Sequence, residues 1–208
     1  MTPVVGLLLA GGLSRRMGGG DKGLTQLGGR SVLSRIIDIA RPQVNALLLN
    51  ANGDPERFSE YDLPVVADVI SDFPGPLAGV LTGLEWLKDN RPDVRWLATF
   101  PSDAPFMPSD LVARMMAEIE DDGAQLACAI TNGRTHPVVG LWPVDLAEDL
   151  RRAMVDEEMR KIDLWTARYS LVEVEFSCDP VDPFFNANRP EDFGEAERLL
   201  ALLEGAPS

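Results

Sequence analysis

Residues 4–22 read VVGLLLAGGLSRRMGGGDK, so an apolar run of strand length leads directly into a loop with five glycines, two adjacent arginines and a lysine. Glycine lets backbone N–H groups come close to an anion, because no Cβ stands in the way. Arginine and lysine neutralise the charge of that anion. A buried strand that ends in such a loop suits a nucleoside triphosphate, and the stretch predicts a nucleotide-binding loop.

The charge distribution supports a compact polyanion as the ligand. The chain has a formal charge of −14, but its first 35 residues hold five basic residues and one acidic residue, a formal charge of +4. The rest of the chain therefore carries −18. A nucleic-acid duplex needs a broad basic face, so no nucleic acid is expected as a partner. An anionic membrane surface is disfavoured for the same reason.

The length of 208 residues predicts one domain, residues 1–208, with one sizeable core. The apolar run at 4–10 is too short to cross a bilayer and lacks a preceding basic region, which favours a cytoplasmic location. Cys128 and Cys178 have no close ligand spacing, so free thiols are expected rather than a disulfide or a zinc site. His136 is the sole histidine, which excludes a histidine-based metal cluster.

Strand-like and helix-like patterns alternate along the chain. Ser31 is a predicted helix N-cap, and Ser109 or Asp110 is another. This alternation predicts an α/β fold, with a three-layer, doubly wound, mostly parallel sheet and helices on both faces. Strands are expected at residues 4–9, 44–49, 64–67, 95–100, 125–130, 137–141 and 171–176, and helices at 31–40, 76–88, 108–120, 146–154, 158–167 and 190–203.

Polar residues follow nearly every predicted strand. In doubly wound sheets, ligands bind beyond the carboxyl ends of the strands. The convergence of polar segments on that edge therefore predicts the site more strongly than any single motif does. The segments are 10–22, 50–52, Asp68, 101–103, 131–136 and 186–188.

The glycine-rich loop fits neither of the common phosphate-binding motifs. Residues 18–23 match G-x-G-x-x-G, but eight residues separate Leu9 from Gly18 and no helix pattern follows directly. The Walker pattern fails because Lys22 is followed by Gly23 rather than by serine or threonine. The density of glycine and basic residues still favours a phosphate cradle over an ordinary surface loop.

Several candidate residues have a functional and a structural interpretation. Asp103, which neighbouring prolines enclose, could be a Mg²⁺ ligand or could form a turn. Asp68 could bind a ligand or form a turn, and Asn50 could bind a ribose or a base edge or cap a turn. His136 could be a base or a hydrogen-bonded structural residue. The segment 74–79 could approach a base or start a helix, and Asn186 and Asn188 could bind a second ligand or cap the last helix.

These segments together resemble the molybdenum cofactor guanylyltransferase family, a branch of the Rossmann-like nucleotidyltransferases. The likeness extends in order over nearly the whole chain, and Arg189 stands where the family usually carries threonine. The matching segments are LAGGLSRRMG at 9–18, DKG at 21–23, LLNAN at 48–52, Asp68, DFPGPLAG at 72–79, PSDAPF at 101–106, HPV at 136–138 and NANRPED at 186–192.

The resemblance implies transfer of GMP from GTP to the phosphate of Mo-molybdopterin, with release of pyrophosphate. It implies Mg²⁺ as the cofactor, with Asp103 as its ligand, and catalytic roles for Lys22, Arg16 and Asp103. It further implies a monomer that makes at most transient contact with cofactor-insertion or acceptor proteins. The residues that it assigns to the nucleotide are Leu9, Ala10, Gly11, Gly12, Lys22, Asn50, Asp68, Gly79 and Asp103, with Asn186 and Asn188 on the pterin side.

Two other hypotheses remain at this point. A sister enzyme could use CTP with the same pterin, or could transfer a nucleotide to a sugar phosphate or to lactate phosphate, because a few backbone contacts around Gly12 and Gly79 select the base. A non-catalytic pterin carrier is a hypothesis of another class. It would not need Lys22 or Asp103, so their presence argues against it.

Overall fold

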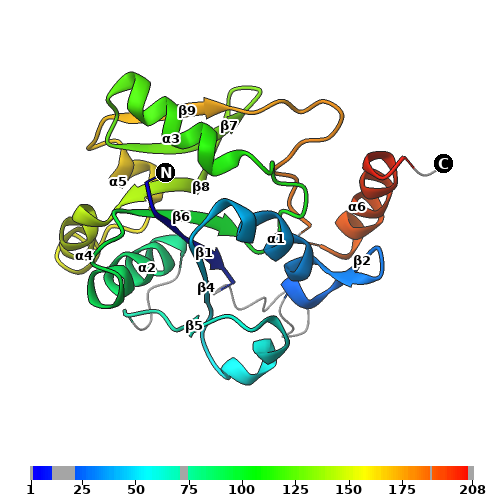
Figure 1. Cartoon of the computed structure of the whole chain (residues 1–208), viewed down its shortest axis with the longest axis horizontal. Coiled ribbons are helices and arrows are strands. Elements are labelled where there is room, and N and C mark those ends of the chain that lie inside the picture. Colours follow the sequence, from blue (N-terminus) through cyan, green and yellow to red (C-terminus); the bar gives the residue numbers. More distant parts are fainter. Residues whose placement is uncertain (1, 11–21, 71–74, 188, 206–208) are drawn as a thin grey trace.

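A seven-stranded, mostly parallel sheet forms the centre of the computed structural model, which describes residues 2–10, 22–70, 75–187 and 189–205 (Figure 1). All neighbouring strands run parallel except β8, which is antiparallel to both of its neighbours. The predicted α/β architecture is confirmed. The order across the sheet is β5 (Val65–Val66), β4 (Ala46–Asn50), β1 (Val4–Leu9), β6 (Trp96–Pro101), β8 (Arg134–Pro143), β7 (Leu126–Thr131) and β9 (Leu171–Glu175).

The reversed strand β8 follows from a tight hairpin. Asn132 and Gly133 connect β7 to β8, and both have positive φ, 48° and 73°. Two such residues fit the turn type that matches the twist of a hairpin. Strand β8 consequently begins at Arg134, and His136 lies within the strand rather than in a loop.

Helices cover both faces of the sheet, as predicted. Figure 1 shows α1 and α3 on one face and α2 and α4 on the other. Strand β1 explains this sandwich, since Val4 and Leu8 belong to one core and Val5 and Leu7 to the other. A strand buried on both faces must lie in the middle of the sheet. The helices are α1 (Val32–Ala40), α2 (Pro76–Asn90), α3 (Leu111–Asp122), α4 (Ala147–Val155), α5 (Ile162–Thr166) and α6 (Pro190–Leu203).

Helix α2 lies unusually close to the sheet because of two glycines one turn apart. A Cβ at Gly83 would stand 2.8 Å from Leu7 Cδ2 and 2.7 Å from Leu97 Cδ2. Gly79 makes a similarly close approach nearer to the helix N-terminus. The glycines therefore let the beginning of α2 meet the carboxyl edge of β1 and β4.

Both predicted helix N-caps are found, but only one of them makes a side-chain cap bond. Ser31 is the N-cap of α1, and its Oγ accepts from Ser34 N at 3.1 Å, as predicted. The N-cap of α3 is Asp110, one of the two residues predicted for that position. Asp110 occupies the N-cap position without a side-chain cap bond, while Gln43 Oε1 accepts from Val112 N at 3.0 Å. The cap comes from a residue that is distant in sequence, so local patterns could not reveal it.

Other local features also differ from the sequence prediction. The helix expected at 158–167 is confined to Ile162–Thr166, and Glu158 has a φ of 54°, which a helix does not accommodate. A small hairpin of β2 (Gln26–Leu27) and β3 (Arg30–Ser31) and a 3-10 segment at Pro55–Tyr61 were not predicted.

Cys128 and Cys178 are free thiols. Among the described helices, none is both long and apolar enough to cross a membrane.

Candidate active site

The carboxyl ends of β1, β4, β5 and β6 bring several predicted site residues to one edge of the sheet. Leu9 pairs with Asn50 of β4 on one side and with Pro101 of β6 on the other. Ala10 N donates to Asn50 O at 2.9 Å, and Ser102 N donates to Leu9 O at 3.3 Å. Backbone hydrogen bonds therefore hold the carboxyl ends of β1, β4 and β6 side by side, as expected of parallel strands.

Asn50 and Asp68 are in direct contact. Asn50 lies at the end of β4, is 2% exposed, and donates its Nδ2 to Val66 O at 3.2 Å and to Asp68 Oδ1 at 2.9 Å. These bonds fix the amide, so its Oδ1 points away from Asp68. Asp68 is half-buried just beyond β5. The two residues thus form one hydrogen-bonded polar unit at this edge.

Asn52 belongs to the polar segment 50–52 that was predicted at this edge, but it was not among the residues assigned to the nucleotide. Its Nδ2 donates to Asp68 Oδ2 at 2.7 Å, and its Oδ1 accepts from Asp68 N at 2.9 Å. A signal for it existed, because residues two apart in an extended segment share a side, and Asn52 stands two residues after Asn50.

Gly79 lies against the other side of the Asn50 amide. A Cβ built on Gly79 would be 2.5 Å from Asn50 Oδ1 and 2.5 Å from Leu9 Cδ2. No side chain fits there without moving Asn50 or the helix. Three predicted nucleotide-binding residues, Leu9, Asn50 and Gly79, therefore lie close together.

We expect Gly79→Ala to impair binding of the nucleotide predicted at this edge, although alanine is the better helix former. The added methyl must displace Asn50 or push α2 outward, and overpacking of this kind costs about 1–3 kcal/mol. The KM for that nucleotide should rise about tenfold. Gly194→Ala in α6 is the matched control, since nothing lies within 4 Å of its Cβ position, and it should leave KM unchanged. An unaltered KM in Gly79→Ala would show that the contact does not shape the site.

Asp103 follows the neighbouring strand β6 and lies two residues beyond its last residue. Its backbone oxygen accepts from Ala187 N at 2.9 Å, which brings the segment of Asn186 beside it. A Cβ at Gly23 would lie 3.4 Å from Ser102 O, so the chain that follows Lys22 also returns to this point. Three segments far apart in sequence therefore meet at Asp103.

Part of the predicted site lies outside the described residues. These positions are Gly11, Gly12, Arg16 and Asn188, and for Lys22 only the backbone is described, at the start of a 3-10 segment. Asn186 is exposed. Arg189 is the N-cap of α6, and its backbone N–H donates to Asp192 Oδ2 at 2.7 Å. Within the described part of the chain, the N-cap residue of α6 is therefore an arginine and not Asn186.

The donor set at Asp103 fits a magnesium ion that also binds substrate. No group of three or more histidine, cysteine, aspartate or glutamate side chains within the described ranges could hold a metal alone. Mg²⁺ commonly needs only one or two carboxylates, with phosphate oxygens and water completing its shell. Asp103 offers such a carboxylate at a half-buried position.

His136 has the environment of a structural residue. Its Nε2 lies 2.7 Å from Thr131 Oγ1, and its ring packs on Phe184 at a centroid distance of 4.7 Å. His136 is only 9% exposed, and this burial lowers its pKa. These contacts support the hydrogen-bonded interpretation of His136 over a role as a base.

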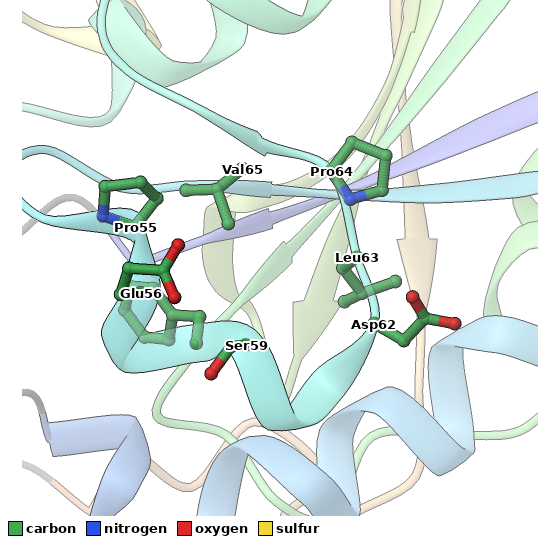
Figure 2. A pocket seen from close by; sticks show the side chains of 8 residues that line it. Pro55, Glu56, Ser59, Asp62, Leu63, Pro64 and Val65 are labelled. Atoms are coloured by element: carbon green, nitrogen blue, oxygen red, sulfur yellow. The ribbon is translucent and has the colours of Figure 1, made fainter.

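A hollow of about 430 Å³ lies beside the segment that precedes β5. It is lined by residues of the 55–65 segment, among them Glu56, Asp62 and Pro64. Figure 2 shows these side chains around the 3-10 segment that precedes β5. The lining includes none of the predicted site residues, so this hollow is not the predicted nucleotide site.

Comparisons with known proteins agree with this geometry. A family profile described as "MobA-like NTP transferase domain" matches residues 6–169. A protein of Nitrobacter hamburgensis named molybdenum cofactor guanylyltransferase is 54% identical, over 98% of this chain and 97% of its own length. One of Rhodopseudomonas palustris with the same name is 54% identical, over 95% and 93%. The crystal structure of molybdopterin-guanine dinucleotide biosynthesis protein A from Archaeoglobus fulgidus has a TM-score of 0.73 at 20% identity, covering 95% of this chain and 99% of that one.

Proposed function

The chain belongs to the molybdenum cofactor guanylyltransferase family of MobA-like NTP transferases, and from this membership we propose that it transfers GMP from GTP to the phosphate of Mo-molybdopterin. The products are pyrophosphate and the guanine dinucleotide form of the cofactor. The observation that carries the proposal is the convergence of Leu9, Asn50, Asp68 and Asp103 on one edge of the sheet.

We propose that the nucleotide lies along this edge from Asp68 to Asp103. An ionised carboxylate only accepts hydrogen bonds, so Asp68 suits the N–H groups of guanine or the hydroxyls of ribose and would repel phosphate. With Asn50, it therefore belongs to the guanosine end. The backbone of Leu9, Ala10, Gly11 and Gly12 would line the path toward the phosphates.

The triphosphate end needs positive charge. Lys22 and Arg16 are the basic residues proposed for this role, and Asp103 is the residue proposed to hold Mg²⁺ against the phosphates. When bound, Mg²⁺ supplies Lewis-acid polarisation of phosphate oxygens and a template for their orientation. A divalent metal has a precedent in this fold, because a Mycobacterium tuberculosis protein that is 16% identical to this chain was crystallised in complex with manganese.

The reaction is a displacement at the α-phosphorus. An oxygen of the molybdopterin phosphate attacks it, the bond to the α–β bridging oxygen breaks, and pyrophosphate leaves with the electron pair of that bond. This chemistry requires little covalent participation by the protein, and positioning and electrostatics provide most of the acceleration. Lys22 and Arg16 would stabilise the charge that develops on the leaving oxygens.

The acceptor would approach from the side of Asn186 and Asn188. The hydrogen bond from Ala187 N to Asp103 O supports this placement, because it holds that segment next to the proposed metal ligand. We propose that the chain acts as one catalytic unit, monomeric, with its N-terminal part on the nucleotide and its C-terminal part on the pterin. Contact with cofactor-insertion or acceptor proteins would be transient.

The experiment that tests the proposal offers GTP, CTP, ATP and UTP in turn, with Mo-molybdopterin and Mg²⁺. We expect pyrophosphate release with GTP and a product whose mass is that of the guanine dinucleotide. Product formation with CTP in preference to GTP would favour the sister-enzyme hypothesis, which the names of the relatives do not support. No product with any nucleotide would contradict the enzymatic proposal.

A further inference from the structure

We propose that Asn52 is a positioning residue that holds Asp68 in the orientation needed to bind the guanosine part of GTP. The inference rests on the proposed function, since it assumes that Asp68 faces the nucleotide. It assigns a role to a residue of the predicted polar segment 50–52 that had been given none, and it derives from the hydrogen bonds around Asp68.

Asn52 clamps Asp68 from two sides. The amide nitrogen of Asn52 holds Oδ2 at 2.7 Å, while its amide oxygen holds the Asp68 backbone N–H at 2.9 Å. The side chain and the backbone of Asp68 are therefore fixed by the same planar group. Hydrogen bonds to an ionised partner are stronger than those between neutral groups.

Hydrogen bonds from Asn50 to Asp68 and from Val69 to Thr82 further restrict the orientation of Asp68. Asn50 Nδ2 holds Oδ1 at 2.9 Å, so each carboxylate oxygen receives one amide donor. Thr82 Oγ1, buried in α2, accepts from Val69 N at 3.0 Å and donates to Ala78 O at 2.7 Å. Asp68 is thus anchored to β4 and the segment after it through two amides, and to α2 through the next residue.

This arrangement explains why an asparagine stands at each of the two positions. Each carboxylate oxygen has two lone-pair directions, and one amide donor leaves a further direction available to a ligand. A carboxylate whose rotation is blocked loses less entropy when it binds than one that turns freely. Asn52 therefore acts on GTP affinity through Asp68, without contacting the nucleotide itself.

A double-mutant cycle on the KM for GTP tests the inference. Asn52→Ala should raise KM about tenfold in the wild-type background and leave kcat within about twofold, the size expected for one charged hydrogen bond. In the Asp68→Ala background the same substitution should change KM by less than about twofold, because the group that it positions is gone. Asn52→Asp should raise KM more than Asn52→Ala, since it turns a carboxylate toward Asp68 and keeps the side-chain shape.

Two controls separate this role from a loss of stability. Asn90→Asp adds the same charge at an exposed helix end and should leave KM unchanged. Asn45→Ala removes an amide that accepts from Val4 N at 2.8 Å, at the start of β1, and should lower the melting temperature without raising KM. An equal KM effect of Asn52→Ala in both backgrounds, or none in the wild type, would overturn the inference. An unchanged KM in Asp68→Ala alone would instead overturn the nucleotide role proposed for Asp68.

Discussion

Asp103→Ala should abolish GTP-dependent turnover while the protein stays folded. The carboxylate is the only ligand that we propose the protein gives to Mg²⁺, so its removal takes away both the charge stabilisation and the alignment of the phosphates. We expect kcat to fall by about 10²- to 10³-fold, the range seen when one preorganised electrostatic group at a reacting centre is lost. Pyrophosphate release with GTP and Mo-molybdopterin measures the effect directly.

Asp103→Asn and Asp110→Asn refine that test. Asp103→Asn keeps the size and shape of the side chain, so a comparable loss of kcat would identify the charge as the essential property. Asp110→Asn neutralises a nearby exposed aspartate that makes no side-chain cap bond, and it should keep full activity. The melting temperatures of all three variants should stay close to that of the wild type. Wild-type turnover in Asp103→Ala would refute the metal role.

Lys22→Ala should cost about 2–4 kcal/mol of transition-state stabilisation, or roughly 30- to 1,000-fold in kcat/KM. The ammonium group is proposed to neutralise charge that grows on the leaving pyrophosphate, and such contacts strengthen along the reaction coordinate. Steady-state kinetics with saturating Mo-molybdopterin and varied GTP provide the value. The effect should appear in kcat as well as in KM, because the contact is strongest in the transition state.

Lys88→Ala is the matched control for Lys22→Ala. Lys88 forms an exposed ion pair with Glu148 at 2.7 Å, on helix α2 but away from its N-terminus. Exposed pairs of this kind contribute little to stability, so neither activity nor melting temperature should change much. If Lys22→Ala lowered only the melting temperature and left kcat/KM intact, Lys22 would be a structural residue.

The sequence predicted most of the sheet because parallel strands leave simple signals. The run from Val4 to Leu9 is apolar on both faces, which fits its central position. The site edge was predictable for the same reason, since polar residues after parallel strands must meet at one edge. Asn50 and Asp68 were named from this rule, and the structure brings them to 2.9 Å.

The features that the sequence did not reveal depend on contacts between distant segments. The side-chain cap on α3 comes from Gln43, which accepts from Val112 N. These residues are 69 positions apart, so no local sequence pattern encodes the bond. The clamp of Asn52 on Asp68 also joins separate segments. By contrast, the Asn132–Gly133 hairpin was a local signal that was missed, and it explains the single reversed strand.

A crystal structure of the protein with GTP and Mg²⁺ is the most direct test of the account. We predict guanosine against Asn50 and Asp68, the triphosphate alongside residues 9–12, and a metal ion within bonding distance of an Asp103 carboxylate oxygen. The Lys22 ammonium group should face the phosphates. A structure with GTP bound elsewhere, for example in the hollow at residues 55–65, and with the edge between Asp68 and Asp103 lacking nucleotide, would contradict the central claim.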